Sequence, residues 1–238
     1  MRVHVAFTPA ESAEAPIAIV VDVLRATSTF AQALAAGYPR ILCCAEIDEA
    51  RALREEIGEG LLGGERKGVR IPDFDVGASP REFLEPRDVP LIFSTTNGTS
   101  AILTAASRCE TVLLGSLLNL DAVVAEARRS GEDVAVLCAG FQGGFALDDA
   151  YCAGRIVELL DGVDTDAAIA ARLVARAYPD ALTALRARTY GPPGLEEDIA
   201  FCARESVLEA VPRFSRMVGP AAEVVETGPA VSEPQGVG

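Results

Sequence analysis

A short apolar run near the start of the chain, residues 16–21, stops directly at a carboxylate, Asp22. The run is rich in β-branched residues and does not alternate with polar ones, which is typical of a strand buried on both faces of a parallel sheet. Arg25 follows, and an alanine-rich helix is predicted over 29–36, closed by Gly37. Because open α/β sheets bind ligands at the carboxyl ends of their strands, we expect Asp22 and Arg25 in an active site. The alternative role for Asp22 is an N-cap of the helix.

The same order of elements occurs twice: a strand, a polar turn, a small-residue helix, a second strand and a second helix. The two copies cover approximately residues 16–60 and 89–130, which suggests an internal duplication of β-α-β-α units. A further strand is predicted over 133–138, followed by a glycine-rich loop and a helix that starts near Leu147. This alternation predicts an α/β protein with three layers, α/β/α, around a mostly parallel sheet. The predicted strands of the two units are 16–21, 40–44, 91–93 and 111–114, and their helices start near residues 29, 48, 101 and 121.

Length and composition fit one large domain. The chain has 238 residues, of which 50% are hydrophobic, and this is enough for a sizeable core. We predict a single α/β catalytic domain over 1–225, in which the two similar halves are followed by a helical C-terminal part. The remaining residues, 226–238, show no periodic pattern and are expected to form a disordered tail.

Charge and cysteine usage argue against several classes of protein. Thirty-five acidic residues oppose 21 basic ones, for a net charge of -14, and Lys67 is the only lysine. Nucleic acid is therefore not an expected partner, because phosphate contacts need a basic face. The single histidine, His4, and six cysteines without a Cys-x-x-Cys pair argue against a zinc site. Without a signal-peptide pattern or a membrane-spanning apolar run, we expect a soluble, reduced, cytoplasmic protein that does not bind membranes.

The remaining inventory of polar residues restricts the chemistry. The chain contains neither a Gly-x-Ser-x-Gly elbow nor a phosphate-binding P-loop, and its lone histidine lies in a short predicted strand. Carboxylates, hydroxyls, glycine-rich turns and arginines are left, and these suit an anionic substrate together with Mg²⁺, which takes oxygen ligands. The helix start after Asn97 and Gly98 offers backbone N–H groups to an oxyanion.

Four stretches carry the candidate residues. The first joins Asp22 and Arg25 to Ser28, and the second is 63–66, where a glycine pair that lets the backbone approach a ligand precedes Glu65 and Arg66. The third is the donor-rich turn 95–99, and the fourth is 138–140 with the acids Asp148 and Asp149 at the next helix start. Each has a structural alternative: a surface ion pair for Glu65 and Arg66, a turn with an N-cap for 95–99, and helix-dipole complements for the two acids.

Six short motifs in this chain resemble those of the 2-phosphosulfolactate phosphatase family. They occur in the family's order and cover roughly residues 17–215, with Ala78 where the family pattern leads us to expect a polar residue. The resemblance implies a Mg²⁺-dependent acid phosphatase that converts 2-phosphosulfolactate to sulfolactate and phosphate, a step of coenzyme M biosynthesis in methanogens, and it suggests a homodimer. The family also occurs in bacteria that make no coenzyme M, so a related 2-phospho acid is an alternative substrate. The motifs are residues 22–29, 62–66, 74–80, 95–99, 138–140 and 147–149.

We assign roles on this basis. Arginine binds phosphate, sulfonate and carboxylate groups in a bidentate manner, and amides and hydroxyls can donate to the remaining oxygens. The expected catalytic residues are Asp22, Arg25, Glu65 and Asn97. The expected substrate-binding residues are Ser28, Arg66, Thr96, Gly98, Thr99 and Gly140, and the expected metal ligands are Asp22, Asp148 and Asp149.

Two other functions remain open at this point. An isochorismatase-like cysteine hydrolase would use Asp22 and Cys138, with Lys67 as the only available lysine. A non-catalytic protein that binds an anionic metabolite is the second. A haloacid-dehalogenase mechanism is disfavoured because Leu24 stands where its second aspartate is needed, and a Cys-x5-Arg phosphatase fails because Gly144 replaces the arginine.

Overall fold

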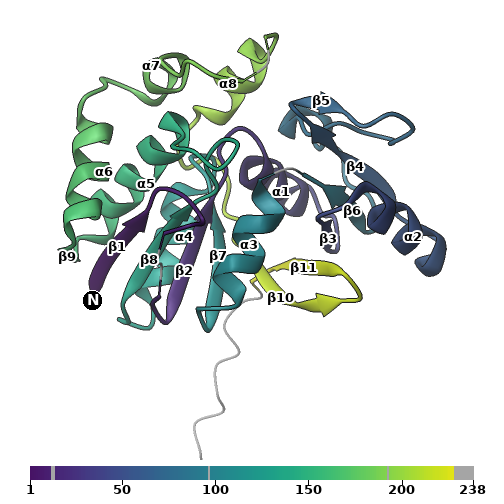
Figure 1. The fold of residues 1–238 in the computed structure, drawn as a ribbon, viewed down its shortest axis with the longest axis horizontal. Helices are drawn as coiled ribbons and strands as arrows, with labels where there is room; N and C mark the ends of the chain where they lie inside the picture. The colour runs from purple at the N-terminus through teal and green to yellow at the C-terminus, as the bar shows by residue number, and fades with distance from the viewer. Residues whose placement is uncertain (12–13, 96, 192, 228–238) are drawn as a thin grey trace, which may run out of the picture.

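A single mixed sheet with helices on both faces forms the centre of the molecule, so the predicted three-layer α/β/α class is confirmed (Figure 1). The computed structural model describes residues 1–11, 14–95, 97–191 and 193–227. Of the predicted tail, Glu226 is the last residue of a strand, and residues from 228 onward lie outside the described residues.

One group of parallel strands surrounds β2 (Ile17–Val21), which is buried along its whole length as its composition predicts. It pairs in parallel with β7 (Thr111–Gly115) and β8 (Val134–Cys138). The sheet then continues through β1 (Arg2–Ala6), parallel to β8, and ends at the short β9 (Val163–Asp164).

The other parallel group is built around β6 (Leu91–Ser94), which lies between β3 (Ile41–Cys44) and β4 (Leu61–Arg66). The short β5 (Val69–Arg70) pairs antiparallel with β4 at the sheet edge. Both glycines of the pair at 63–64 lie in β4. A Cβ at Gly64 would stand 2.1 Å from the Ser94 carbonyl oxygen of β6. Gly64 therefore allows β6 to pack closely against β4, whereas the sequence had suggested that the glycine pair lets the backbone approach a ligand.

An antiparallel hairpin, β10 (Pro212–Val218) and β11 (Ala221–Glu226), joins the two groups, with β10 beside β7 and β11 beside β3. The strand order is β5-β4-β6-β3-β11-β10-β7-β2-β8-β1-β9. The two repeated units are β2-α1-β3-α2 and β6-α3-β7-α4, and each gives one strand to each parallel group. On either side of the hairpin, the second strand of one unit lies next to the hairpin and the first strand of the other unit lies beyond it. Such a symmetric strand order is what an internal duplication would produce.

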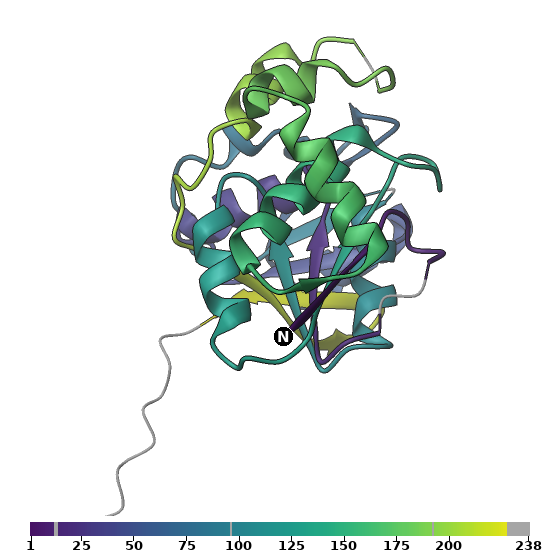
Figure 2. The same ribbon diagram turned by 90° about the vertical axis from the view of Figure 1, so that its left-hand side faces the viewer.

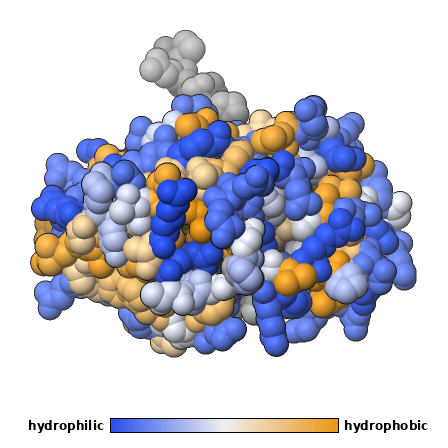
Figure 3. Space-filling model, turned by 90° about the horizontal axis from the view of Figure 1, so that it is seen from above, coloured by the Kyte–Doolittle hydropathy of each residue, from blue (hydrophilic) through white to orange (hydrophobic). Residues whose placement is uncertain are grey.

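Helices cover both faces of the sheet (Figures 1 and 2). On one face α4, α5 and α6 pack on the strands around β2, and on the other α1 and α3 pack on the same sheet. Seen from above, the end of the molecule that carries α7, α8 and β5 shows hydrophilic side chains mixed with smaller apolar areas (Figure 3). The helices are α1 (Ala26–Ala35), α2 (Ile47–Ile57), the 3₁₀ turn η1 (Pro80–Glu82), α3 (Gly98–Ala106), α4 (Leu120–Arg128), α5 (Leu147–Leu160), α6 (Asp166–Arg176), α7 (Ala181–Arg186) and α8 (Glu196–Cys202).

Two of these helices start earlier than the sequence predicts. Helix α1 begins at Ala26, and the Arg25 carbonyl accepts its first helical hydrogen bond, from the Thr29 N–H at 2.9 Å. The Thr27 N–H, which has no partner inside the helix, donates to the Asp22 main-chain carbonyl at 3.0 Å. Helix α3 begins at Gly98, so the last residues of the predicted polar turn are already helical. Both helices therefore point their N-termini directly at the ends of strands. None of the helices in the described ranges is long and apolar enough to cross a membrane.

The joining hairpin contains a buried acid that should make stability depend on pH. Glu223 of β11 accepts hydrogen bonds from Arg40 at 3.0 Å and from Arg216 at 2.9 Å. Burial acts to raise the pKa of Glu223, but the two arginines outweigh it, and the pKa lies below its ordinary value of 4.5. A lowered pKa gives stability that is present above pH 4.5 and is lost as the pH falls through the lowered value.

We therefore expect Glu223→Gln to reduce the free energy of unfolding at pH 7 by about 1.5–3 kcal/mol, the range for hydrogen bonds to charged groups. The difference from the wild type should shrink as the pH falls below 4.5. Urea unfolding at several pH values measures both. Glu226→Gln, at the exposed end of the same strand, is the control and should change little; a Glu223 effect that stays constant with pH would contradict the assignment.

Candidate active site

A pocket opens where the C-terminal ends of β2, β4 and β6 meet. Asp22 follows β2, Glu65 lies near the end of β4, and Thr95 and Asn97 follow β6; all four line the pocket. Asp148 enters from the first turn of α5. The pocket lies at the strand ends, where α/β sheets bind ligands. The remaining lining residues are Leu24, Arg25, Ala26, Lys67, Gly68, Ala78, Phe93, Phe141, Gln142, Arg188, Tyr190, Gly191 and Leu195.

Asp22 both starts a helix and faces the pocket. Its Oδ1 accepts the backbone N–H of Ala26 at 3.3 Å, so the N-terminal role that the sequence left open is present as well. Burial raises the pKa of the Asp22 carboxyl to about 7, and the charges of Asp148 and Glu65 also raise it. The hydrogen bond from Ala26 and the charge of Arg25 act in the opposite direction. A carboxyl that titrates near neutrality can take up or release a proton at working pH.

Asp148 is held by a residue that is distant in the sequence. Its Oδ1 accepts a hydrogen bond from the hydroxyl of Tyr190, whose ring stacks on Phe141 with centroids 4.7 Å apart. Burial raises the pKa of Asp148, whereas the Tyr190 hydrogen bond and the charge of Arg188 lower it. Burial and the Asp148 charge also raise the pKa of Tyr190. The phenol therefore stays protonated at neutral pH and donates to the carboxylate.

The neighbouring acid, Asp149, does not line the pocket. Its Oδ1 accepts the backbone N–H of Val23 at 2.9 Å, and its Oδ2 accepts that of Gly140 at 3.0 Å. Both carboxylate oxygens are thus occupied by backbone groups that follow β2 and β8. Burial and the charges of Asp148 and Asp22 raise its pKa well above the ordinary value. Asp149 fixes the strand ends, and its oxygens are poorly placed to serve as the metal ligand that the sequence predicted.

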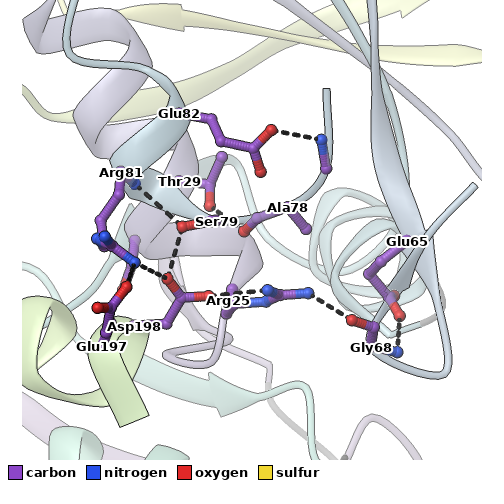
Figure 4. A network of polar contacts seen from close by, with 12 residues as sticks. Arg25, Thr29, Glu65, Gly68, Ala78, Ser79, Arg81, Glu82, Glu197 and Asp198 are labelled. Carbon is purple, nitrogen blue, oxygen red and sulfur yellow. Dashed lines mark hydrogen bonds and ion pairs between the residues drawn. The ribbon is translucent and has the colours of Figure 1, made fainter. Parts of the chain in front are cut away.

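Glu65 and Arg25 meet at the tight turn between β4 and β5. The Gly68 N–H donates to Glu65 Oε2 at 2.6 Å, and Arg25 Nη2 donates to the Gly68 carbonyl at 2.9 Å. Arg25 Nη1 also donates to Asp198 of α8 at 2.8 Å (Figure 4). Thr95 Oγ1 donates to the other oxygen of Glu65 at 3.2 Å. Arg25 lines the pocket as predicted, but a buried carboxylate already balances its charge.

Other predicted substrate-binding residues are used within the fold. Ser28 Oγ donates to the Val23 carbonyl at 2.8 Å, and Thr99 Oγ1 donates to the Cys44 carbonyl at 3.4 Å. Arg66 donates to the carbonyls of Ala45 and Glu65 and to the hydroxyl of Ser94. None of these three side chains lines the pocket. Their polar groups donate to buried or half-buried acceptors of the fold instead. The sequence pattern could not distinguish such donors from donors that face a ligand.

The two predicted glycines have supporting roles. A Cβ at Gly98 would stand 2.7 Å from that of Ala26 and 3.0 Å from Asp22 Oδ2, so the absence of a side chain lets α3 start beside Asp22. Gly140 adopts φ 69° and gives its N–H to Asp149. The sixth predicted substrate-binding residue, Thr96, lies outside the described residues. Ala78 lines the pocket, and its carbonyl accepts the Thr29 hydroxyl at 2.8 Å.

Three residues near the pocket were missed by the sequence reasoning, and a fourth, Lys67, was considered only as the lysine of a cysteine hydrolase. Tyr190, Arg188 and Asp198 come from the helical C-terminal part, where no motif marked them. Lys67 lines the pocket from the β4–β5 turn. Its signal was available, since it is the only lysine of the chain and follows the predicted pair Glu65 and Arg66.

The donor chemistry of the pocket can be compared with the needs of a metal ion. Within the described part of the chain, no group of three His, Cys, Asp or Glu side chains is placed to hold a metal by itself. Asp22 and Asp148 nevertheless line one pocket, and the charge of Asp148 raises the pKa of Asp22. Mg²⁺ is commonly held by one or two carboxylates that are completed by water and phosphate oxygens. The residues fit that mode, with Asp22 and Asp148 as the protein ligands.

Comparison with known proteins identifies the family. The family model described as 2-phosphosulpholactate phosphatase matches residues 4–216. The chain belongs to the 2-phosphosulfolactate phosphatase family. A protein of Thermus thermophilus named probable 2-phosphosulfolactate phosphatase is 40% identical over 233 residues, which cover 93% of this chain and 98% of the relative. Proteins of the same name from Symbiobacterium thermophilum and Deinococcus radiodurans are 39% identical over 221 residues and 37% identical over 225 residues. These matches cover 87% and 89% of this chain, and 94% and 92% of the two relatives.

The cysteine-hydrolase alternative finds no support in this geometry. Cys138 is fully buried at the end of β8 and does not line the pocket. Burial and the charge of Asp149 raise the pKa of the Cys138 thiol well above its ordinary value. A nucleophilic cysteine needs an accessible thiolate, and this site provides the opposite environment.

We expect the Cys138 thiol to resist alkylation in the folded protein. Iodoacetamide at pH 8, followed by peptide mass spectrometry, should leave Cys138 unmodified, because the thiol is both buried and protonated. The same treatment in urea should modify it fully and serves as the control. Fast native-state alkylation of Cys138, with the protein still folded by circular dichroism, would restore the cysteine nucleophile as a candidate.

Proposed function

We propose that this protein is a Mg²⁺-dependent phosphatase that hydrolyses 2-phosphosulfolactate, or a closely related 2-phospho acid, to the hydroxy acid and phosphate. The observation that carries the proposal is the pairing of two buried carboxylates, Asp22 and Asp148, with three cationic side chains in one strand-end pocket. The cations are Arg25, Lys67 and Arg188. The family match and the names of the relatives supply the substrate.

The charges that phosphomonoester hydrolysis requires support this combination of carboxylates and cations in the pocket. Phosphomonoester hydrolysis requires negative charge on the phosphoryl oxygens to be neutralised and a water molecule to be aimed in line with the leaving oxygen. Mg²⁺ bound to Asp22 and Asp148 would supply that neutralisation. Without a cation the two carboxylates repel each other in a buried site, which is part of the reason that the pKa of Asp22 is raised to about 7.

The chain's own residues then position the reactants. Asn97 precedes the first turn of α3 and does not cap that helix with its side chain, so its amide can donate to a phosphoryl oxygen. The N-terminus of α3 favours the same negative charge. Glu65 holds the β4–β5 turn and accepts the Thr95 hydroxyl, and thereby orders the pocket wall. Asp22 or Glu65 accepts the proton of the attacking water.

The proposal includes the homodimer that the family resemblance implies and the cytoplasmic location expected from the sequence pattern, with a small phospho-acid as the ligand. In an organism that makes coenzyme M the reaction would serve that biosynthesis, and elsewhere a related 2-phospho acid would be the substrate.

Phosphate release measured with malachite green tests the function. Purified protein should release phosphate from 2-phosphosulfolactate when Mg²⁺ is present, and EDTA should abolish the release until Mg²⁺ is added back in excess. The metal dependence follows from a pocket whose carboxylates need a cation to accept a phosphate. Equal release with and without EDTA would refute the dependence on Mg²⁺. Binding of 2-phospho acids without turnover of any of them would indicate a non-catalytic binding protein.

Asp22→Asn separates chemistry from folding. We expect kcat to fall by about two orders of magnitude or more, as for loss of a transition-state contact. Stability should not fall with it. Because the folded-state pKa of Asp22 is raised from 3.8 to about 7, ionisation of Asp22 costs stability as the pH rises through that range. In EDTA at pH 8 the variant should therefore melt at the same temperature as the wild type or higher.

The matched control is Asp88→Asn, an exposed acid in the loop before β6, which should leave both kcat and the melting temperature unchanged. Near-full turnover of Asp22→Asn at saturating Mg²⁺ would reduce Asp22 to a helix-starting residue.

A further inference from the structure

The only lysine of the chain lies in a turn whose backbone disfavours it. Lys67 connects β4 to β5 with φ 56°, in the left-handed region that residues with a Cβ rarely adopt. The next residue, Gly68, also has positive φ, as a tight two-residue hairpin turn requires. Glycine or asparagine would suit the position of Lys67 better. Lys67 lines the candidate active-site pocket and is exposed to solvent.

Residues of the pocket itself hold this turn in place. Glu65 accepts the Gly68 N–H at 2.6 Å, and Arg25 donates to the Gly68 carbonyl at 2.9 Å. Arg25 is fixed in turn by its ion pair with Asp198 at 2.8 Å, in which both side chains are buried. Figure 4 shows Gly68 between Glu65 and Arg25, the two side chains that bind it. The position of Lys67 is therefore set by Glu65 and Arg25, which themselves line the pocket.

The three cations of the pocket differ in how their charge is used. Arg25 is balanced by Asp198, and Arg188 donates to the Tyr190 carbonyl and acts on Asp148. Lys67 has no ion pair or hydrogen bond within the described ranges. Its ammonium group, which has three donors, is thus available to an anionic group of a ligand in the pocket.

We propose that Lys67 binds the second acidic group of the substrate, the carboxylate or sulfonate that accompanies the phosphate, and so selects phosphomonoesters that carry another anion nearby. This inference rests on the proposed function. The phosphoryl group lies deep in the pocket by Asp22 and Asp148, and the second anion reaches outward to the clamped turn. Lys67 is a specificity-determining residue, whereas Arg25 and Asp198 act through the turn as positioning residues.

Two substrates that differ only in the second anion test the assignment. 2-Phospholactate carries a carboxylate, and isopropyl phosphate has a methyl group in its place. We expect Lys67→Met to lower kcat/KM for 2-phospholactate about tenfold, mainly through KM, as loss of a charge-assisted hydrogen bond does. For isopropyl phosphate the variant should match the wild type. Lys67→Arg should restore most of the selectivity, because it keeps the charge.

Arg70→Met, which removes an exposed cation from the adjacent β5, is the matched control and should alter neither substrate. Equal losses of Lys67→Met on both substrates, no loss at all, or the same loss in Arg70→Met would overturn the inference. Calorimetric binding of both compounds to the wild type and to Lys67→Met, with Ca²⁺ in place of Mg²⁺ to keep the carboxylates neutralised, repeats the comparison under conditions that slow turnover. A protein that hydrolyses no 2-phospho acid, 2-phosphosulfolactate included, but in which Lys67→Met loses affinity only for 2-phospholactate would refute the proposed function and keep the role of Lys67.

Discussion

The carboxylate of Asp149 sets the arrangement on which the pocket depends. By accepting the N–H groups of Val23 and Gly140, it joins the residues after β2 and β8 to the start of α5. A buried carboxylate without such partners would be costly, so these contacts hold firmly. Because Asp148 is its neighbour in α5 and Asp22 directly follows β2, one structural acid brings two pocket-lining acids together.

This concentration of buried negative charge opposes stability and favours function. The raised pKa of Asp22 means that folding is weakened by its ionisation in the absence of a cation. Natural proteins commonly retain such unfavourable groups where activity needs them. The cost is limited by Arg25 and by the hydroxyl of Tyr190, which reach the acids from other parts of the chain.

Contacts between residues that are far apart in the sequence hold the segments around the pocket in place. Asp198 of α8 accepts hydrogen bonds from Arg25 and, at 2.5 Å, from the hydroxyl of Ser79. Arg25 in turn reaches the β4–β5 turn at Gly68. One buried carboxylate from the C-terminal helices therefore orders segments that follow β2 and β5, and the turn that carries Lys67 is held between them.

The sequence by itself determined the α/β class, the buried strand that ends at Asp22, the repeated units and the family, because burial and strand-helix alternation are local properties of the pattern. Only the tertiary structure decided which polar groups face the pocket. Asp148 and Asp149 are adjacent and chemically identical, yet one lines the pocket and the other binds backbone. Ser28, Thr99 and Arg66 also turn to backbone carbonyls. Such choices depend on the partner that each side chain meets across the fold, as Tyr190 meets Asp148, and the sequence around a residue does not contain that partner.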